Sequence, residues 1–258
     1  MHTAFSRDGT RIVFETGGSG PALVVVNGAL SDRSSVTPLR SYLEPHFTVV
    51  GYDRRGRCDS GDTAPYAPER EIEDLAAVIE AVAAPAFVYG HSSGGILALR
   101  SAASGVAMRR LAVNEPPFIL PNTRPLPGSD VTARIEALLS SGDREGALQL
   151  FLLEQVGLPE AALARLSTSP AWPRMIVLAH TAAYDSMLAG TDEFAPSEFT
   201  SLSVRTLVLH GTTNFPWIIA TARKLAEILP DAEIVQLDGQ PHSPAPDVLA
   251  PHLIRFFR

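Results

Sequence analysis

Short apolar segments recur along the chain, and most are continuous rather than alternating with polar residues. They are residues 22–26, 47–53, 86–90, 110–113, 206–211 and 233–239. Continuous apolar runs of this length are typical of strands that are covered on both faces, as in a parallel sheet. The polar stretch at residues 1–18 differs from them and predicts a hairpin, not an apolar leader segment.

Segments with helical periodicity lie between these strands. In residues 68–82 the apolar positions fall on one face, behind a proline at the first position and acidic residues in the first turn. Residues 216–229 repeat this design. Because strands and helices alternate, the sequence predicts an α/β fold with a doubly wound, mostly parallel sheet.

The alternation stops between residues 116 and 199, where we expect several helices but no strand. The sequence therefore predicts a core of residues 1–115 and 200–258 and a helical cap, residues 116–199, inserted after the strand at 110–113. Ligands of α/β folds bind at the carboxyl ends of the strands, and a cap in this place would cover that edge. We expect the cap to shape the substrate pocket.

Composition and charge exclude several classes of protein. The chain has 258 residues, of which 45% are apolar, and this suits one globular α/β domain with an insertion. A net charge of −7 argues against a nucleic-acid partner. No apolar run approaches the roughly 20 residues that span a bilayer, and the single cysteine excludes an internal disulfide. We expect a cytoplasmic protein with no membrane partner; its oligomeric state stays open, a homodimer included.

The strongest chemical signal is the sequence GHSSG at residues 90–94, which follows a predicted strand and precedes a predicted helix. A GxSxG motif in this context forms a turn so sharp that only small residues flank the serine. Ser92 is therefore the predicted nucleophile, and the backbone N–H of Ser93 is a predicted oxyanion donor. A second donor is expected from the loop after an earlier strand, where Gly28 or Ala29 supplies the N–H.

Together these segments resemble the α/β-hydrolase superfamily across essentially the whole chain. The sequence YDRRGRCDSG, residues 52–61, is similar to the DxRGxGxS turn of that superfamily, with Cys58 where glycine is usual. The turn is structural in the superfamily, and we do not expect Cys58 to act as a catalytic thiol.

Position separates the seven histidines as candidates for the general base. His242 lies just beyond the last predicted strand and ahead of the C-terminal helix, where this fold places its base. His91 is the variable residue of the nucleophile turn and is expected to face away from the serine, and His210 ends a buried strand. His242 is the predicted base.

The acid is missing from its usual position. The superfamily commonly has an aspartate where this chain has Asn214, and an amide cannot stabilise the imidazolium of the base. Two interpretations stay open: the protein binds a small molecule without turnover, or another carboxylate reaches His242. Glu115 directly follows the strand that lies beside the nucleophile strand, and it is the predicted acid. Asp238 and the cap residue Asp185 are weaker candidates.

A glutamate after this strand resembles the arrangement in some haloalkane dehalogenases and in the zearalenone lactonases. The dehalogenases use an aspartate nucleophile, so the lactonases are more similar. The sequences GHSSGG, NEPP, VVNGAL and PAWPR resemble the nucleophile turn, the glutamate turn, the oxyanion loop and a cap segment of the lactonases. This resemblance implies a triad of Ser92, Glu115 and His242, with Trp172 in the pocket.

The pocket is expected to be apolar and aromatic. Its predicted residues are Leu30, Phe118, Trp172, Met175, Ile176, Tyr184 and Trp217. We expect a serine hydrolase that cleaves a carboxylic ester or lactone of a hydrophobic small molecule through an acyl-enzyme. No cofactor or metal is expected, because the sequence lacks a ligand cluster and a dinucleotide glycine pattern. Acyl transfer, as in a cyclising thioesterase or a perhydrolase, stays open because it shares the acyl-enzyme.

Overall fold

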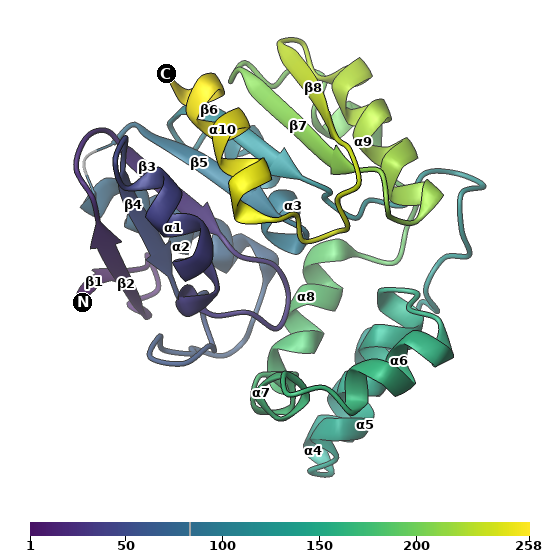
Figure 1. Ribbon diagram of the computed structural model, residues 1–258. Coiled ribbons are helices and arrows are strands. Elements are labelled where there is room, and N and C mark those ends of the chain that lie inside the picture. The colour runs from purple at the N-terminus through teal and green to yellow at the C-terminus, as the bar shows by residue number, and fades with distance from the viewer. Residues whose placement is uncertain (83) are drawn as a thin grey trace.

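A computed structural model describes residues 1–82 and 84–258 of the chain (Figure 1). In these residues eight strands form one sheet in the order β1-β2-β4-β3-β5-β6-β7-β8. The strands are β1 (His2–Phe5), β2 (Arg11–Gly17), β3 (Ala22–Val26), β4 (Thr48–Tyr52), β5 (Ala86–His91), β6 (Met108–Asn114), β7 (Thr206–Gly211) and β8 (Ala232–Leu237). The first two pair in antiparallel fashion, and β3 to β8 are parallel. The predicted α/β fold is confirmed.

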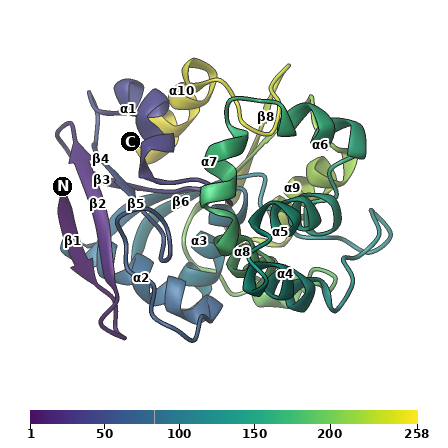
Figure 2. The same ribbon diagram turned by 90° about the horizontal axis from the view of Figure 1, so that it is seen from below.

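Helices cover both faces of the sheet (Figure 2). The helices of this core are α1 (Thr37–Leu43), α2 (Pro68–Ala81), α3 (Ser93–Ala103), α9 (Pro216–Ile228) and α10 (Pro246–Phe257), with a short 3-10 helix at Arg33–Val36. Strand β3 shows why its apolar run is continuous. Leu23 and Val25 pack with α1 and α10, whereas Val24 and Val26 pack with α2, α3 and α9 on the other face. Successive side chains of a strand point to opposite faces, so both sets must be apolar.

Between β6 and β7 the described chain contains helices and no strand. These are α4 (Val131–Ser140), α5 (Arg144–Leu150), the π-helical turn Phe151–Gln155, α6 (Glu160–Ser167), α7 (Trp172–Val177) and α8 (Ala182–Ala189), with 3-10 helices at Ala179–Thr181 and Pro196–Glu198. We call residues 116–199 the helical insertion. Figure 1 shows helices α4 to α8 gathered below the sheet. The insertion has a hydrophobic core of its own, built around Ile135, Leu148, Phe151 and Trp172.

The predicted elements differ from the structure mainly at their ends. Strand β6 begins at Met108, two residues before the apolar segment from which it was predicted. Arg109 interrupts the apolar pattern there, and the start of this strand is less buried than its end. Within residues 1–82 and 84–258, no helix combines the length and the apolar character needed to cross a bilayer.

Candidate active site

Ser92 lies in the sharp turn between β5 and α3. Its backbone has φ +55° and ψ −126°, a left-handed conformation that is costly for a residue with a side chain. The glycines beside it have no space for a side chain. A Cβ on Gly94 would lie 2.2 Å from the carbonyl oxygen of Val26, and a Cβ on Gly90 would lie 2.5 Å from the carbonyl oxygen of Gly94. Close packing of the start of α3 against the end of β3 at Gly94, and of the turn against itself at Gly90, thus explains why the motif needs glycine at both positions.

Glu115 follows β6 directly and is fully buried. Its Oε1 accepts a hydrogen bond of 2.8 Å from the N–H of Gly211, and its Oε2 lies 2.5 Å from Nδ1 of His242. A buried carboxylate needs such partners to offset its loss of water. The contact can hold the proton of the His242 ring on Nδ1 and leave Nε2 free as a base.

Asn214, at the usual position of the acid, also contacts Glu115. Its Nδ2 donates a hydrogen bond to Oε2 of Glu115, and its Oδ1 accepts one of 2.7 Å from the N–H of Phe215. The second bond fixes the orientation of the amide, so that its NH₂ group points to the carboxylate. Asn214 thus places a hydrogen-bond donor beside the carboxylate of Glu115, which follows the neighbouring strand.

His91 holds the loop that carries His242. Its Nε2–H donates a hydrogen bond of 3.0 Å to the backbone carbonyl of His242, and Asn114 donates one of 3.1 Å to the same oxygen. The two imidazole rings are 4.8 Å apart. Burial, together with the proximity of His242, lowers the pKa of His91 to about 4, so this ring is neutral near pH 7.

The predicted oxyanion donors lie beside the serine. A Cβ on Gly28 would lie 3.0 Å from the Cβ of Ser92, so a glycine lets this loop approach Ser92 closely. Ser93 is the first residue of α3, where backbone N–H groups have no partner within the helix. Ala29, Ser92 and Ser93 line one cavity. These amides can therefore face an oxyanion formed at Ser92.

This cavity has a volume of about 210 Å³ and almost entirely apolar walls. Ser92, His242 and Asn214 line it on the side of the sheet. Its other residues are Ala29, Ser93, Pro117, Phe151, Gln155, Val156, Leu158, Asp185, Ala189, Phe215, Trp217 and Ile218. Among the described contacts there is no hydrogen bond between the Ser92 hydroxyl and His242. Catalytic contacts of this kind often form only when substrate is bound.

The structure corrects the predicted pocket, because Trp217 alone of its seven residues lines this cavity. Trp172 is buried in the core of the insertion, where its Nε1–H donates a hydrogen bond of 2.9 Å to Glu145. Leu30, Met175 and Ile176 pack against the same core.

The last two predicted pocket residues also make other contacts. Phe118 packs against Phe194 and Phe199 in the main core. Tyr184 stacks on Tyr66 with 4.0 Å between ring centroids. Helical periodicity shows which side chains share a face of a helix but not which face meets the cavity. Sequence reasoning therefore missed Phe151, Gln155, Val156 and Leu158.

The alternative chemical groups lie elsewhere. Asp238 accepts a hydrogen bond of 2.8 Å from Gln236 and has no described contact with His242. Cys58 donates to Asp32 over 3.4 Å, and burial and nearby carboxylates raise the pKa of its thiol to about 11. Asp185 lines the cavity but is paired with buried arginines.

The fold and this constellation define an α/β-hydrolase. Residues 23–252 match the alpha/beta hydrolase family, so the chain belongs to it. An alpha/beta hydrolase from Sphaerobacter thermophilus DSM 20745 is 49% identical over 100% of both chains, with a TM-score of 0.95. The enol-lactonase from Burkholderia xenovorans LB400 is 21% identical over 99% of both chains, with a TM-score of 0.74, and shares the fold. The uncharacterized hydrolase YraK of Bacillus subtilis (strain 168) is 32% identical over 95 residues, only 35% of either chain.

Proposed function

We propose that the protein is a serine hydrolase that cleaves a carboxylic ester or lactone of a hydrophobic small molecule. The observation that carries this proposal is the 2.5 Å contact between Nδ1 of His242 and the buried carboxylate of Glu115, beside a cavity that Ser92 also lines. Ser92 as nucleophile, His242 as base and Glu115 as acid are the three groups that acyl transfer through serine requires.

The proposed reaction has two stages. Nε2 of His242 takes the proton of the Ser92 hydroxyl as Oγ attacks the carbonyl carbon, and the amides of Ser93 and of Gly28 or Ala29 bind the oxyanion. His242 returns the proton to the departing alkoxide, which leaves an acyl-enzyme. Water that His242 deprotonates then attacks the acyl carbon. The bond from this carbon to Oγ of Ser92 breaks, His242 returns the proton to Oγ, and the acid leaves. Glu115 stabilises the imidazolium in both stages.

The helical insertion is proposed to act as the cap of this site. It contributes Phe151, Val156, Leu158 and Ala189 to the walls, and core helix α9 contributes Trp217. Apolar walls favour an apolar acyl or alkoxy group and exclude water from the charges that develop in the reaction. The hydrophobic character proposed for the substrate therefore rests on these walls.

The resemblance of the segment around Glu115 to the glutamate turn of the zearalenone lactonases supports a lactone as one form of the substrate. It gives no support for the particular macrolactone, because Trp172, the proposed counterpart of their substrate-contacting tryptophan, is enclosed in the insertion core. A simple aryl ester is the appropriate first probe.

Labelling with a fluorophosphonate tests the proposal. We expect the wild-type protein to form one covalent adduct and to hydrolyse p-nitrophenyl butyrate, since both need an activated serine. The Ser92→Ala variant should form no adduct and lose at least about 10³-fold in kcat. Mass spectrometry of the intact proteins measures the adduct. An unlabelled wild type, or equal labelling of the two, would show that the protein binds without this chemistry.

A further inference from the structure

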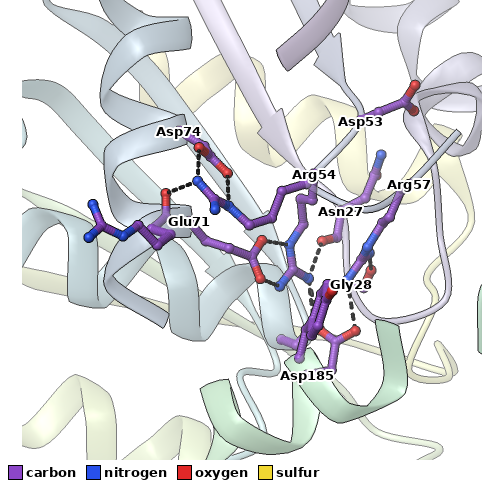
Figure 3. Close-up of polar contacts among 12 residues, drawn as sticks. Asn27, Gly28, Asp53, Arg54, Arg57, Glu71, Asp74 and Asp185 are labelled. Atoms are coloured by element: carbon purple, nitrogen blue, oxygen red, sulfur yellow. Dashed lines mark hydrogen bonds and ion pairs between the residues drawn. The ribbon is translucent and has the colours of Figure 1, made fainter. Parts of the chain in front are cut away.

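Four charged side chains that the proposed reaction does not use are buried in one network, and one of them, Asp185, lines the cavity (Figure 3). Arg54, Arg57, Glu71 and Asp185 are each 1% exposed. Removal of two cations and two anions from water is costly, so a buried ion network is a weak source of stability. Its contacts therefore need another explanation, and several of them reach the proposed oxyanion donors.

Asp185 is the centre of this network. Its Oδ1 accepts a hydrogen bond of 2.8 Å from Nη1 of Arg54, and its Oδ2 accepts one of 2.7 Å from Nη2 of Arg57. Arg54 is in turn held by Glu71, which accepts bonds of 2.6 and 2.7 Å from the same guanidinium. Asp185 belongs to α8 of the helical insertion, whereas both arginines follow β4 in the core. The carboxylate thus joins the two parts of the protein.

Arg57 extends this connection to the oxyanion loop. Its Nη1 donates a hydrogen bond of 2.7 Å to the carbonyl oxygen of Gly28 and one of 3.1 Å to that of Ser31. In a trans peptide the C=O of one residue and the N–H of the next point in opposite directions. Since the carbonyl of Gly28 is bound to Arg57, the N–H of Ala29 is directed away from Arg57. Ala29 lines the cavity with Ser92, so the arginine fixes the orientation of a proposed oxyanion donor.

The second proposed donor is held by the same carboxylate. The hydroxyl of Ser93 donates a hydrogen bond of 2.8 Å to Oδ1 of Asp185 and accepts one of 3.2 Å from Arg54. Ser93 is the residue after the nucleophile, and its side chain is buried. Asp185 is therefore bonded directly to the residue that carries one donor and, through Arg57, to the peptide that carries the other.

We propose that Asp185 is a positioning residue that aligns both oxyanion donors and makes their alignment depend on the docking of helix α8. The inference rests on the proposed function. A group with this role affects the transition state more than the bound substrate, because the oxyanion exists only after attack by the serine. Loss of Asp185 should thus lower kcat and leave KM nearly unchanged.

The test compares Asp185→Asn with Asp74→Asn. Asp74 is a matched control because it is also 1% exposed and accepts two bonds of 2.8 Å from one arginine, Arg55. The other described side-chain contacts of Arg55 go to residues 6, 8 and 70, and none of them is in the oxyanion loop. For each variant, kcat and KM for p-nitrophenyl butyrate, the Ki of an alkyl trifluoromethyl ketone and the thermal midpoint are measured. The ketone forms a tetrahedral adduct with serine and so reports on the oxyanion donors.

We expect Asp185→Asn to lower kcat by about 10- to 100-fold and to raise Ki in proportion. This is less than the roughly 10²- to 10³-fold loss that removal of one oxyanion donor causes, because the donors stay present but are misaligned. Asp74→Asn should leave kcat and Ki close to the wild-type values. The direction of the change in kcat separates lost charge from lost alignment. Loss of the anion leaves excess positive charge near the oxyanion, and this by itself would raise kcat. A lower kcat therefore indicates lost alignment.

The inference would be overturned if both substitutions changed kcat and Ki by the same factor for the same loss of thermal stability. If Asp185→Asn does not fold, Ser93→Ala tests the inference instead. This variant removes the hydroxyl that is bound to Asp185 and keeps the backbone N–H. This variant should lose several-fold in kcat and in ketone affinity at constant KM, and wild-type values would overturn the inference. A wild-type protein without turnover and without an adduct would instead remove the proposed function and this inference together.

Discussion

The side-chain amide of Asn214 stabilises the carboxylate that we propose as the catalytic acid. Asn214 donates to Oε2 of Glu115, and Gly211 donates to Oε1. The carboxylate is thus held on both oxygens while Nδ1 of His242 remains in contact with it. A donor at residue 214 matches an acid at residue 115, whereas a second carboxylate there would repel it.

Replacement of the acid should therefore be severe. We expect Glu115→Gln to lower kcat for p-nitrophenyl butyrate by about 10² to 10⁴-fold, because glutamine keeps the shape but cannot stabilise the imidazolium. KM should change little, since Glu115 lies behind the base. Steady-state kinetics of the purified variant provide the measurement. Full activity of Glu115→Gln would show that another group orients His242.

Asn214→Asp is the companion to this variant. Alone it should reduce activity, because two adjacent carboxylates repel and the donor to Glu115 is lost. Combined with Glu115→Gln it returns an acid to the usual position of the superfamily and should recover part of the lost kcat. A double variant no better than Glu115→Gln would show that residue 214 is out of reach of the base.

His91 makes stability depend on pH. Burial lowers its pKa from the ordinary 6.5 to about 4, so below pH 6.5 the unfolded chain binds a proton that the folded protein does not. The free energy of unfolding should therefore fall as the pH is lowered from 6.5 to 4. In His91→Gln an amide can still donate to the carbonyl of His242, but residue 91 no longer binds a proton in the unfolded chain.

Thermal midpoints measured between pH 4 and 8 test this. We expect the wild type to lose stability relative to His91→Gln as the pH is lowered. Midpoints of the two proteins that change in parallel with pH would contradict this.

At the scale of residues, the sequence predicted the side chains that follow strands but not the long-range contacts that hold them. Ser92, Glu115 and His242 each follow a strand, and parallel strands bring such ends together. The structure places Glu115 against His242 as the pattern implied. The support given by His91 and the buried pairing of Asp185 depend on contacts across 151 and 131 positions of the chain, and no local pattern reports them.

At the scale of elements, the N-terminal end of α9 separates two cavities. Trp217 and Phe215 line both the active-site cavity and a neighbouring one of about 480 Å³. The guanidinium of Arg124 lies 4.9 Å from the ring centroid of Trp217 and is bonded to the carbonyls of Glu154 and Val156. The indole is thus a wall between the cavities, held in place from the insertion side.

Removal of this wall should change selectivity. In Trp217→Ala the two cavities should merge, and the preference for p-nitrophenyl octanoate over the acetate, measured as the ratio of kcat/KM, should rise about tenfold. Trp172→Phe is the control, because Trp172 lies in the insertion core and should leave this ratio unchanged. A higher ratio in the control alone would place the pocket where the sequence first suggested.

Most elements were predictable because their patterns are local. The continuous run at β3 and the proline that begins α2 identified a buried strand and a helix start without any tertiary information. The π-helical turn Phe151–Gln155 was not predicted, since its apolar residues differ little from those of an ordinary helix. This turn supplies Phe151 and Gln155 to the cavity, so the missed element is one that shapes the substrate site.

At the scale of the whole molecule, several polar contacts join the helical insertion to the core and couple their unfolding. Besides the network of Asp185, Nε2 of His180 lies 2.6 Å from the carbonyl oxygen of Gly56, and the hydroxyl of Tyr184 donates a bond of 2.8 Å to Asp62. Undocking of the insertion would separate Asp185 from both arginines. Arg54 would keep Glu71, but Arg57 would lose its carboxylate partner. Loss of one partner of a buried pair costs about 3–5 kcal/mol where the other charge stays buried. Separate unfolding of the insertion should therefore be unfavourable.

The two tryptophans can test this coupling, because Trp172 lies in the insertion and Trp217 at the start of α9 in the core. Trp217→Phe leaves a fluorescence probe in the insertion, and Trp172→Phe leaves one in the core. In urea, we expect the fluorescence midpoint of each variant to coincide with its own far-UV circular dichroism midpoint, as coincident probes indicate one cooperative transition. Comparison within each variant removes the effect of the substitution on stability. If Trp172 fluorescence had its midpoint at a lower urea concentration than circular dichroism, the insertion would undock first. Asp185→Asn in the same Trp217→Phe background should then increase the difference between the two midpoints.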